Sequence, residues 1–189
     1  SDAPVVLVNN TEMTDLYPAN NVPGAIWQIS PALPPGLTLD VNTGIISGTP
    51  TEAMDNTTFT LWANTSEPRS VESTFYLEVL EDTDGDGMPD TLPDDYPDTG
   101  LPPFDLIEDL DDDADGTPDV DEASNGTNSL NPDTDGDGFC DGPSAVDGVC
   151  YAGPDSHPLD PALPVNTDGD AFPDEDPDGE GGLIADDDD

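Results

Sequence analysis

Acidic side chains recur at fixed spacing in the second half of this chain. Asp82, Asp84 and Asp86 occupy alternate positions, Gly87 follows, and Asp90 comes three residues later. Ca²⁺ is a hard ion that takes about six to eight oxygen ligands, and a tight loop can supply them from positions 1, 3, 5, 7, 9 and 12. Position 7 contributes its backbone carbonyl, and position 6 is a glycine because the chain turns sharply there. This spacing therefore predicts a calcium-binding loop.

Four copies of the pattern begin at residues 82, 111, 133 and 166. The second copy is complete, because Glu122 fills position 12, where a bidentate carboxylate is preferred. The predicted ligands of the first two copies are Asp82, Asp84, Asp86, Met88, Asp90, Asp94 and Asp95, and then Asp111, Asp113, Asp115, Thr117, Asp119 and Glu122. Those of the last two copies are Asp133, Asp135, Asp137, Phe139, Asp141 and Asp147, and then Asn166, Asp168, Asp170, Phe172 and Asp174.

Three of the copies depart from the ideal loop. A proline holds position 12 of the first copy, so Asp94 or Asp95 must substitute, and a serine holds it in the third, where Asp147 is within reach. The fourth copy has an alanine in place of its glycine, and Asp176 and Asp178 open a fifth, overlapping site. We expect the array to bind about four to six Ca²⁺ ions.

Acidic residues are distributed unevenly along the chain. Its formal net charge is −44, from 45 acidic residues against one arginine and no lysine; residues 1–80 carry 9 of the acids and residues 81–189 carry 36. A segment this acidic would be a disordered, solvated tail unless metal ions ordered it. The repeated register favours the second alternative, in which binding energy becomes folding energy. Apolar residues are expected to form small clusters between the ion sites. Nucleic acid is excluded as a partner by repulsion.

Residues 1–80 have the alternating pattern of a small β-sandwich. Strands are predicted at residues 4–8, 25–29, 37–39, 44–47, 59–63 and 75–79. Inward-facing side chains are predicted at Phe59, Leu61, Phe75, Leu77 and Val79. The Asn42-Thr-Gly44 sequence predicts a turn between the third and fourth strands. In the acidic half, only residues 104–110 suggest a short helical turn.

Two resemblances extend this interpretation. The stretch Ile29-Ser-Pro-Ala-Leu-Pro-Pro-Gly-Leu-Thr-Leu-Asp-Val-Asn-Thr-Gly-Ile-Ile-Ser-Gly-Thr-Pro50 resembles the signature of immunoglobulin-like, cadherin-like modules of prokaryotic surface proteins, over residues 3–80. Residues 82–189 resemble thrombospondin type 3 repeats, in which a nearly core-less chain wraps a row of Ca²⁺ ions. The resemblances imply an all-β immunoglobulin-like sandwich at 1–80, followed at 81–189 by an irregular, loop-rich, calcium-wrapped array whose last repeat is truncated. They also imply a location at the cell surface.

Cys140 and Cys150 are the only cysteines. A disulfide between them would close a short loop and would indicate an oxidising compartment; two free thiols are the alternative. A zinc site is disfavoured, because His157 alone cannot complete four nitrogen or sulfur ligands. Sequons that permit N-glycosylation begin at Asn9, Asn56, Asn64 and Asn125.

Function classes can be ranked from the same residues. An enzyme is disfavoured, because His157 is the only imidazole and no apolar pocket is evident that would raise the pKa of one carboxylate of a pair. A calcium-rigidified extracellular structural module, in a surface stalk or a Ca²⁺-dependent filament, fits better, with tandem modules or copies of itself as partners. An adhesin that binds a glycan or a surface protein through bridging Ca²⁺ is the alternative. No apolar run reaches the roughly 18 residues of a membrane-spanning helix.

Overall fold

The computed structural model describes residues 5–20, 22–65, 70–93, 96, 106–151 and 153–161. The chain divides into two compact units, Ser1–Glu108 and Asp109–Asp189. The first acidic loop falls in the first unit in this division, and the predicted domain boundary at residue 80 stays a prediction. Predicted ligands outside the described residues are Asp94, Asp95, Asn166, Asp168, Asp170, Phe172, Asp174, Asp176 and Asp178.

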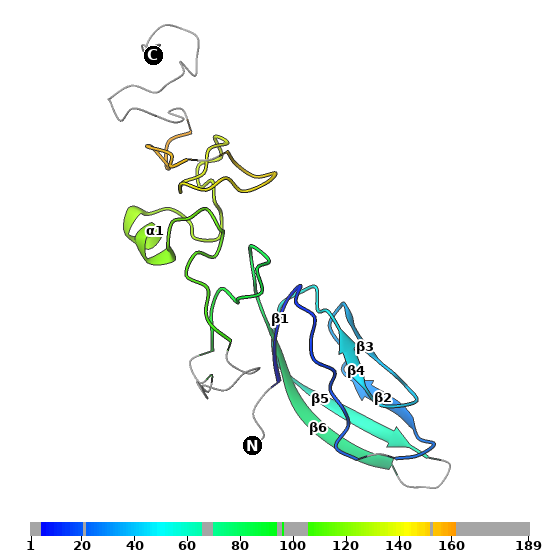
Figure 1. Cartoon of the computed structure of the whole chain (residues 1–189). Helices are drawn as coiled ribbons and strands as arrows, with labels where there is room; N and C mark the ends of the chain where they lie inside the picture. Colours follow the sequence, from blue (N-terminus) through cyan, green and yellow to red (C-terminus); the bar gives the residue numbers. More distant parts are fainter. Residues whose placement is uncertain are drawn as a thin grey trace, which may run out of the picture. The chain divides into compact units, whose positions relative to one another are not determined.

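The first unit contains two β-sheets (Figure 1). The larger sheet has the order β1-β6-β5-β2 and the smaller one pairs β3 with β4. The strands are β1 Val5–Val8, β2 Ile26–Ser30, β3 Leu37–Leu39, β4 Ile46–Gly48, β5 Met54–Asn64 and β6 Ser70–Leu80. β1 runs parallel to β6, and the other pairs are antiparallel. All six predicted strands are present, and β5 and β6 are longer than predicted.

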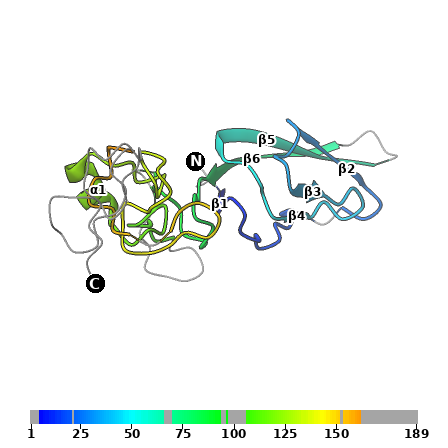
Figure 2. The same ribbon diagram turned by 90° about the horizontal axis from the view of Figure 1, so that it is seen from above.

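Side chains from both sheets meet in one apolar cluster. Phe59 on β5 and Leu77 on β6 are completely buried, and they pack with Leu37 on β3 and Ile46 on β4. Figure 2 shows the two strand layers facing each other. Burial of each such side chain contributes about 1.5–3 kcal/mol. The predicted inward face is therefore confirmed, with Phe75 only half-buried and stacked on Phe59 at a ring separation of 5.6 Å.

The turns of the first unit explain its glycine and proline signature. Gly36 has a φ of 89°, and a Cβ at this position would collide with the carbonyl oxygen of Thr49, so the β3–β4 hairpin packs only around glycine. The Asp40 carboxylate accepts a bond from the amide of Asn42 at 2.8 Å, which closes the predicted turn. Gly44 lies against the ring of Trp27, which a Cβ would also overlap.

The second unit is built from loops around one short helix, α1, Asp119–Asn125. Sequence reasoning did not predict this helix. Three acids in its first turn favour it, because they complement the positive end of the helix dipole. Gly126, with a φ of 88°, ends it. The helical turn predicted at 104–110 is absent from residues 106–110, the part of it that the structure describes.

In the described part of the second unit, most apolar side chains do not form the predicted clusters. Leu110, Val120 and Leu130 are exposed, as are Tyr151 and Leu159. Phe139 and Tyr151 make the one ring pair that the described residues of this unit show, with centroids 6.2 Å apart. Apolar clusters have no room here, because carboxylates occupy the interior.

Candidate metal centre

Three acidic loops are described: loop 1 (residues 82–90), loop 2 (111–122) and loop 3 (133–141). Their backbones turn in the same way, because positions 4 and 6 both adopt the left-handed conformation that favours glycine. The φ angles at position 4 are 81°, 60° and 80° for Gly85, Ala114 and Gly136. Those at position 6 are 97°, 92° and 98° for Gly87, Gly116 and Gly138. Sequence reasoning used the glycine at position 6 and missed the requirement at position 4.

The carboxylate at position 1 is the centre of each turn. Asp133 accepts bonds from the amides of Gly136 and Gly138, at 2.8 and 2.9 Å. Asp82 accepts the equivalent pair in loop 1, at 2.9 and 3.1 Å. Asp111 accepts from the amide at position 6 of loop 2, at 3.1 Å. These bonds curl the chain around its own first side chain.

The carboxylates at positions 3 and 5 each use one oxygen in the same local way. Each accepts from the backbone amide two residues further on, at 2.7–3.1 Å. In loop 2, for example, Asp113 accepts from Asp115, and Asp115 accepts from Thr117. This pattern of Asx turns sets the side chains toward the inside of the loop, and one oxygen each of Asp113, Asp135 and Asp137 is left without a donor.

The carboxylate at position 9 closes the loop. Asp90 accepts from the amide and the hydroxyl of Thr83, both at 2.8 Å. Asp141 accepts from the amide of Thr134 at 3.2 Å, and Asp119 accepts from the amide of Asp112 at 3.1 Å. The position 9 acids thus hold the two ends of their loops together.

The loops bring carboxylate oxygens to within 4.8 Å of one another in four groups. Oxygens bound to one Ca²⁺ at about 2.3–2.6 Å are necessarily this close, so the groups fit such an ion. Three of them consist of positions 1, 3 and 5 of one loop. The groups are Asp82, Asp84 and Asp86; Asp111, Asp113 and Asp115; Asp133, Asp135 and Asp137; and Asp115, Glu122 and Asp141.

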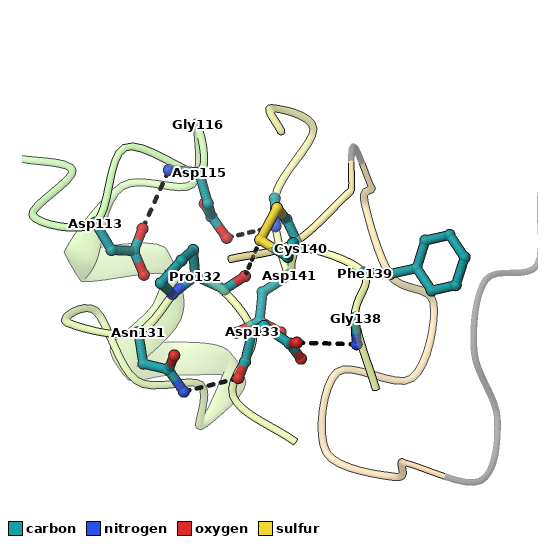
Figure 3. The surroundings of a disulfide bond; sticks show 12 residues. Asp113, Asp115, Gly116, Asn131, Pro132, Asp133, Gly138, Phe139, Cys140 and Asp141 are labelled. Atoms are coloured by element: carbon teal, nitrogen blue, oxygen red, sulfur yellow. Dashed lines mark hydrogen bonds between the residues drawn. A yellow bond between two sulfur atoms is a disulfide. The ribbon is translucent and has the colours of Figure 1, made fainter. Parts of the chain in front are cut away.

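The fourth group joins two loops and a helix. Asp115 comes from loop 2, Glu122 from α1 and Asp141 from loop 3, and all three are buried. The second oxygen of Asp115 also accepts from the amide of Gly142 at 2.6 Å, so loop 2 is bonded directly to the end of loop 3 (Figure 3). Asp141 was predicted to serve loop 3 alone, and the structure places an oxygen of it with the second loop as well.

Buried oxygens without a donor occur in three of these groups, those of loop 2, of loop 3 and of the site between them. Neither oxygen of Glu122, which is completely buried, accepts a hydrogen bond, and one oxygen each of Asp113, Asp135 and Asp137 is in the same state. Burial raises the pKa of Asp113 to about 8, and the charge of Asp115 contributes to this rise. Burial and then Asp115 likewise raise the pKa of Glu122 to about 7. A cation would remove this penalty, because it supplies the missing partner.

The interior of the second unit is an acid core. Among its described residues, the buried apolar side chains are those of Pro132, Cys140 and Cys150, whereas eight carboxylates are buried. The acid core consists of Asp109, Asp112, Asp113, Asp115, Glu122, Asp133, Asp141 and Asp155. Asp109, Asp112 and Asp155 were not predicted. The sequence offers no lysine or arginine after residue 69 to neutralise them.

The predicted disulfide is present. Cys140 and Cys150 are joined, and Val146 pairs with Cys150 to form a small hairpin. Asp147 in this hairpin is exposed. Of the sequon residues, Asn56 and Asn125 are exposed, Asn64 is half-buried and donates to Gln28, and Asn9 is buried. Asn9 is therefore poorly placed to carry a glycan.

A comparison with known protein families matches part of the first unit. Residues 3–80 match the model of the family described as "Putative Ig domain". These residues form an immunoglobulin-like module. Two similar solved structures are titled "Solution structure of the PKD domain from KIAA 1837 protein" and "Chimeric titin Z1Z2 functionalized with a KLER exogenous peptide from decorin". Both are 17% identical, with TM-scores of 0.31 and 0.30; they cover 42% and 41% of this chain, and 82% and 86% of their own lengths.

No curated protein matches the chain. Within the described residues, no helix combines the length and the apolar character that a bilayer crossing requires.

Proposed function

We propose that this protein is a non-catalytic structural module of the cell surface whose second unit is folded around Ca²⁺ ions. One observation supports this most strongly: the acid core, in which eight buried carboxylates replace an apolar interior. Burying carboxylates that have no positively charged partner is costly, and the second unit has no lysine or arginine to offset it. Metal ions are the remaining source of positive charge, so the folding energy of the unit comes from binding them.

Oxygen-only clusters favour Ca²⁺ over softer metals. In this proposal positions 1, 3 and 5 of each loop bind one ion together with the position 7 carbonyls of Met88, Thr117 and Phe139. Asp115, Glu122 and Asp141 bind a further ion that ties loop 2 to loop 3. Extracellular Ca²⁺ is millimolar, which permits sites of modest affinity, and an immunoglobulin-like module is consistent with that location.

The structural role is a stalk or a Ca²⁺-dependent filament built from tandem modules or copies of this chain. β1 lies at one edge of the larger sheet, and it is apolar in sequence. An edge strand of this kind can add the strand of a neighbouring chain. Light scattering and electron microscopy of the purified protein, with and without Ca²⁺, test assembly.

A second candidate is a recognition module that binds a glycan or a surface protein through Ca²⁺. Tyr151 favours it, because this ring is 75% exposed and pairs with Phe139, whose carbonyl belongs to loop 3. An aromatic ring offers a ligand both an apolar face and a polar tip, and here it would lie beside the ion. Glycan binding that depends on both Ca²⁺ and Tyr151 would favour this candidate over the spacer.

Removal of Ca²⁺ tests the main proposal. Excess EDTA should unfold the second unit and leave the immunoglobulin-like module folded, because the latter has its own apolar core. Circular dichroism and limited proteolysis with an acid-specific protease would follow the two units separately. EDTA loaded beforehand with Ca²⁺ is the control. A second unit that stays folded and protease-resistant in EDTA would refute a calcium-dependent fold.

A further inference from the structure

The chain that follows the disulfide folds back onto loop 3. The amide of Tyr151 donates to the carbonyl of Gly138 at 2.8 Å, and the amide of Asp155 donates to the carbonyl of Cys140 at 2.9 Å. Gly153 lies between these contacts, and a Cβ there would collide with the carbonyl oxygens of Cys140 and Gly142. Tyr151, Gly153 and Asp155 are therefore held closely against the end of the loop.

This arrangement buries a carboxylate that belongs to no acidic loop. Asp155 is only 6% exposed. One of its oxygens accepts from the amide of His157 at 2.8 Å, and the other is buried without any hydrogen-bond donor. The local turn accounts for the first oxygen only. Its second oxygen is an unsatisfied acceptor of the kind that requires a ligand.

The surroundings of Asp155 are acidic. Asp135 and Asp137 of loop 3 each have a buried oxygen that also lacks a donor. The bond from the Asp155 amide to the carbonyl of Cys140 places Asp155 beside Asp141, the position 9 acid of loop 3. Asp141 and Asp155 both line an open cavity of about 630 Å³, together with Thr117 of loop 2 and Asn125 of α1.

Loop 3 also lacks a ligand that loop 2 has. Glu122 supplies the position 12 carboxylate of loop 2, whereas Ser144 holds that position in loop 3 and uses its amide to bond the carbonyl of Asp115 at 2.7 Å. The substitute predicted from the sequence, Asp147, is exposed. We infer that Asp155 is the missing carboxylate ligand of the loop 3 cation site, and that the Cys140–Cys150 disulfide positions it. This inference rests on the proposed binding of Ca²⁺.

The disulfide matters because Asp155 is distant from loop 3 along the chain. The bond between Cys140 and Cys150 removes most of the freedom of the intervening residues, which raises the effective concentration of Asp155 at the loop. The affinity of this site should therefore depend on the redox state of the cysteines.

A matched pair of variants of the full chain tests the inference by calorimetric titration with CaCl₂. Asp155→Asn keeps the size of the side chain and the acceptor for His157, and it should weaken one site about 10- to 100-fold, the range seen when a supporting carboxylate is lost. Asp147→Asn removes an exposed acid from the same segment and should change no site. Near-UV circular dichroism at saturating Ca²⁺ verifies that both variants fold.

A second readout identifies which site changes. Tb³⁺ in place of Ca²⁺ is sensitised by nearby aromatic rings, and Phe139 with Tyr151 lies at loop 3, so the emission lost in Tyr151→Phe reports this site. The Tb³⁺ concentration that gives half of the maximal emission should be higher in Asp155→Asn, and also in the Cys140→Ser, Cys150→Ser double variant.

Unchanged affinities in Asp155→Asn, or a loss of affinity in Asp147→Asn instead, would overturn the ligand assignment. Unchanged Tb³⁺ binding by the cysteine variant would overturn the role of the disulfide. If wild-type protein bound no Ca²⁺, the proposed function itself would fail.

Discussion

At the scale of single residues, Glu122 has the least satisfied environment in the described part of the second unit. It is completely buried on α1, neither oxygen has a donor, and Asp115 and Asp141 lie within reach. A carboxylate in this position destabilises the fold unless a cation is bound. Its charge is therefore expected to decide the affinity of the site between loops 2 and 3.

Glu122→Gln should weaken Ca²⁺ binding at that site by about 10-fold or more, because a charged, bidentate ligand becomes a neutral one. Asp121→Asn is the matched control, since Asp121 is an exposed acid on the same helix. Calorimetric titration of both variants measures the difference. Equal effects of the two changes would mean that general charge, and not the cluster, governs binding.

Among the described residues, Ala114 and Asn10 are the non-glycine residues with a positive φ, and alanine tolerates it less well than asparagine. Ala114 occupies position 4 of loop 2 with a φ of 60°, where loops 1 and 3 have glycine. For an L-residue with a Cβ this conformation costs about 1–2 kcal/mol. Part of the cost is offset because alanine has less conformational entropy in the unfolded chain than glycine would have.

Ala114→Gly should raise the free energy of unfolding by about 0.5–1 kcal/mol. The reverse change in loop 3, Gly136→Ala, should lower it by a similar amount, because the space there is open and strain is the only cost. Thermal unfolding at saturating Ca²⁺ compares the two. A loss of stability in Ala114→Gly would show that the loop does not gain from relief of this strain.

At the scale of elements, local patterns were enough to predict much of the molecule. Alternating apolar residues predicted the strands, and the order of aspartates predicted that positions 1, 3 and 5 converge in the three described loops. The disulfide was predicted because few alternatives exist for two cysteines. These features depend on residues that are near one another in sequence.

Features that leave no clear local signal in the sequence were missed. α1 has only seven residues and no apolar face that would show a helical period. Asp155 is buried by contacts with Cys140, and Asp115 meets Gly142, 27 residues away, so neither contact has a local signal. In the described part of the second unit, the predicted apolar clusters were wrong because the loops turn their carboxylates inward and leave Leu110, Leu130 and Leu159 outside.

At the scale of the whole molecule, the acid core links stability to pH. Burial raises the pKa of Asp113 to about 8, of Glu122 to about 7 and of Asp155 to about 6, above their values in an unfolded chain. Without metal, the folded unit then binds more protons than the unfolded chain between about pH 4 and 8, so its stability falls as the pH rises through this window. With Ca²⁺ the dependence reverses, because protons compete with the ion for the same oxygens.

In EDTA, the second unit should therefore be more structured at about pH 5 than at about pH 8. In Ca²⁺, it should be more stable at the higher pH. Thermal scans by circular dichroism at both pH values and in both conditions give the four measurements. The same pH trend with and without Ca²⁺ would contradict the linkage between the acid core and the ions.

The parallel pairing of β1 with β6 has a mechanical consequence. β1 begins the described chain, and β6 ends the strands of the module, with Val5 opposite Leu77 and Val8 opposite Leu80. If the module is pulled at its two ends, the two strands slide in opposite directions along their length. All the hydrogen bonds between them then bear the load together, in shear, and cannot open one after another. The module should resist stretching well beyond what its small apolar core suggests, and force spectroscopy should show Leu7→Pro, which removes an amide from β1, to unfold at a much lower force.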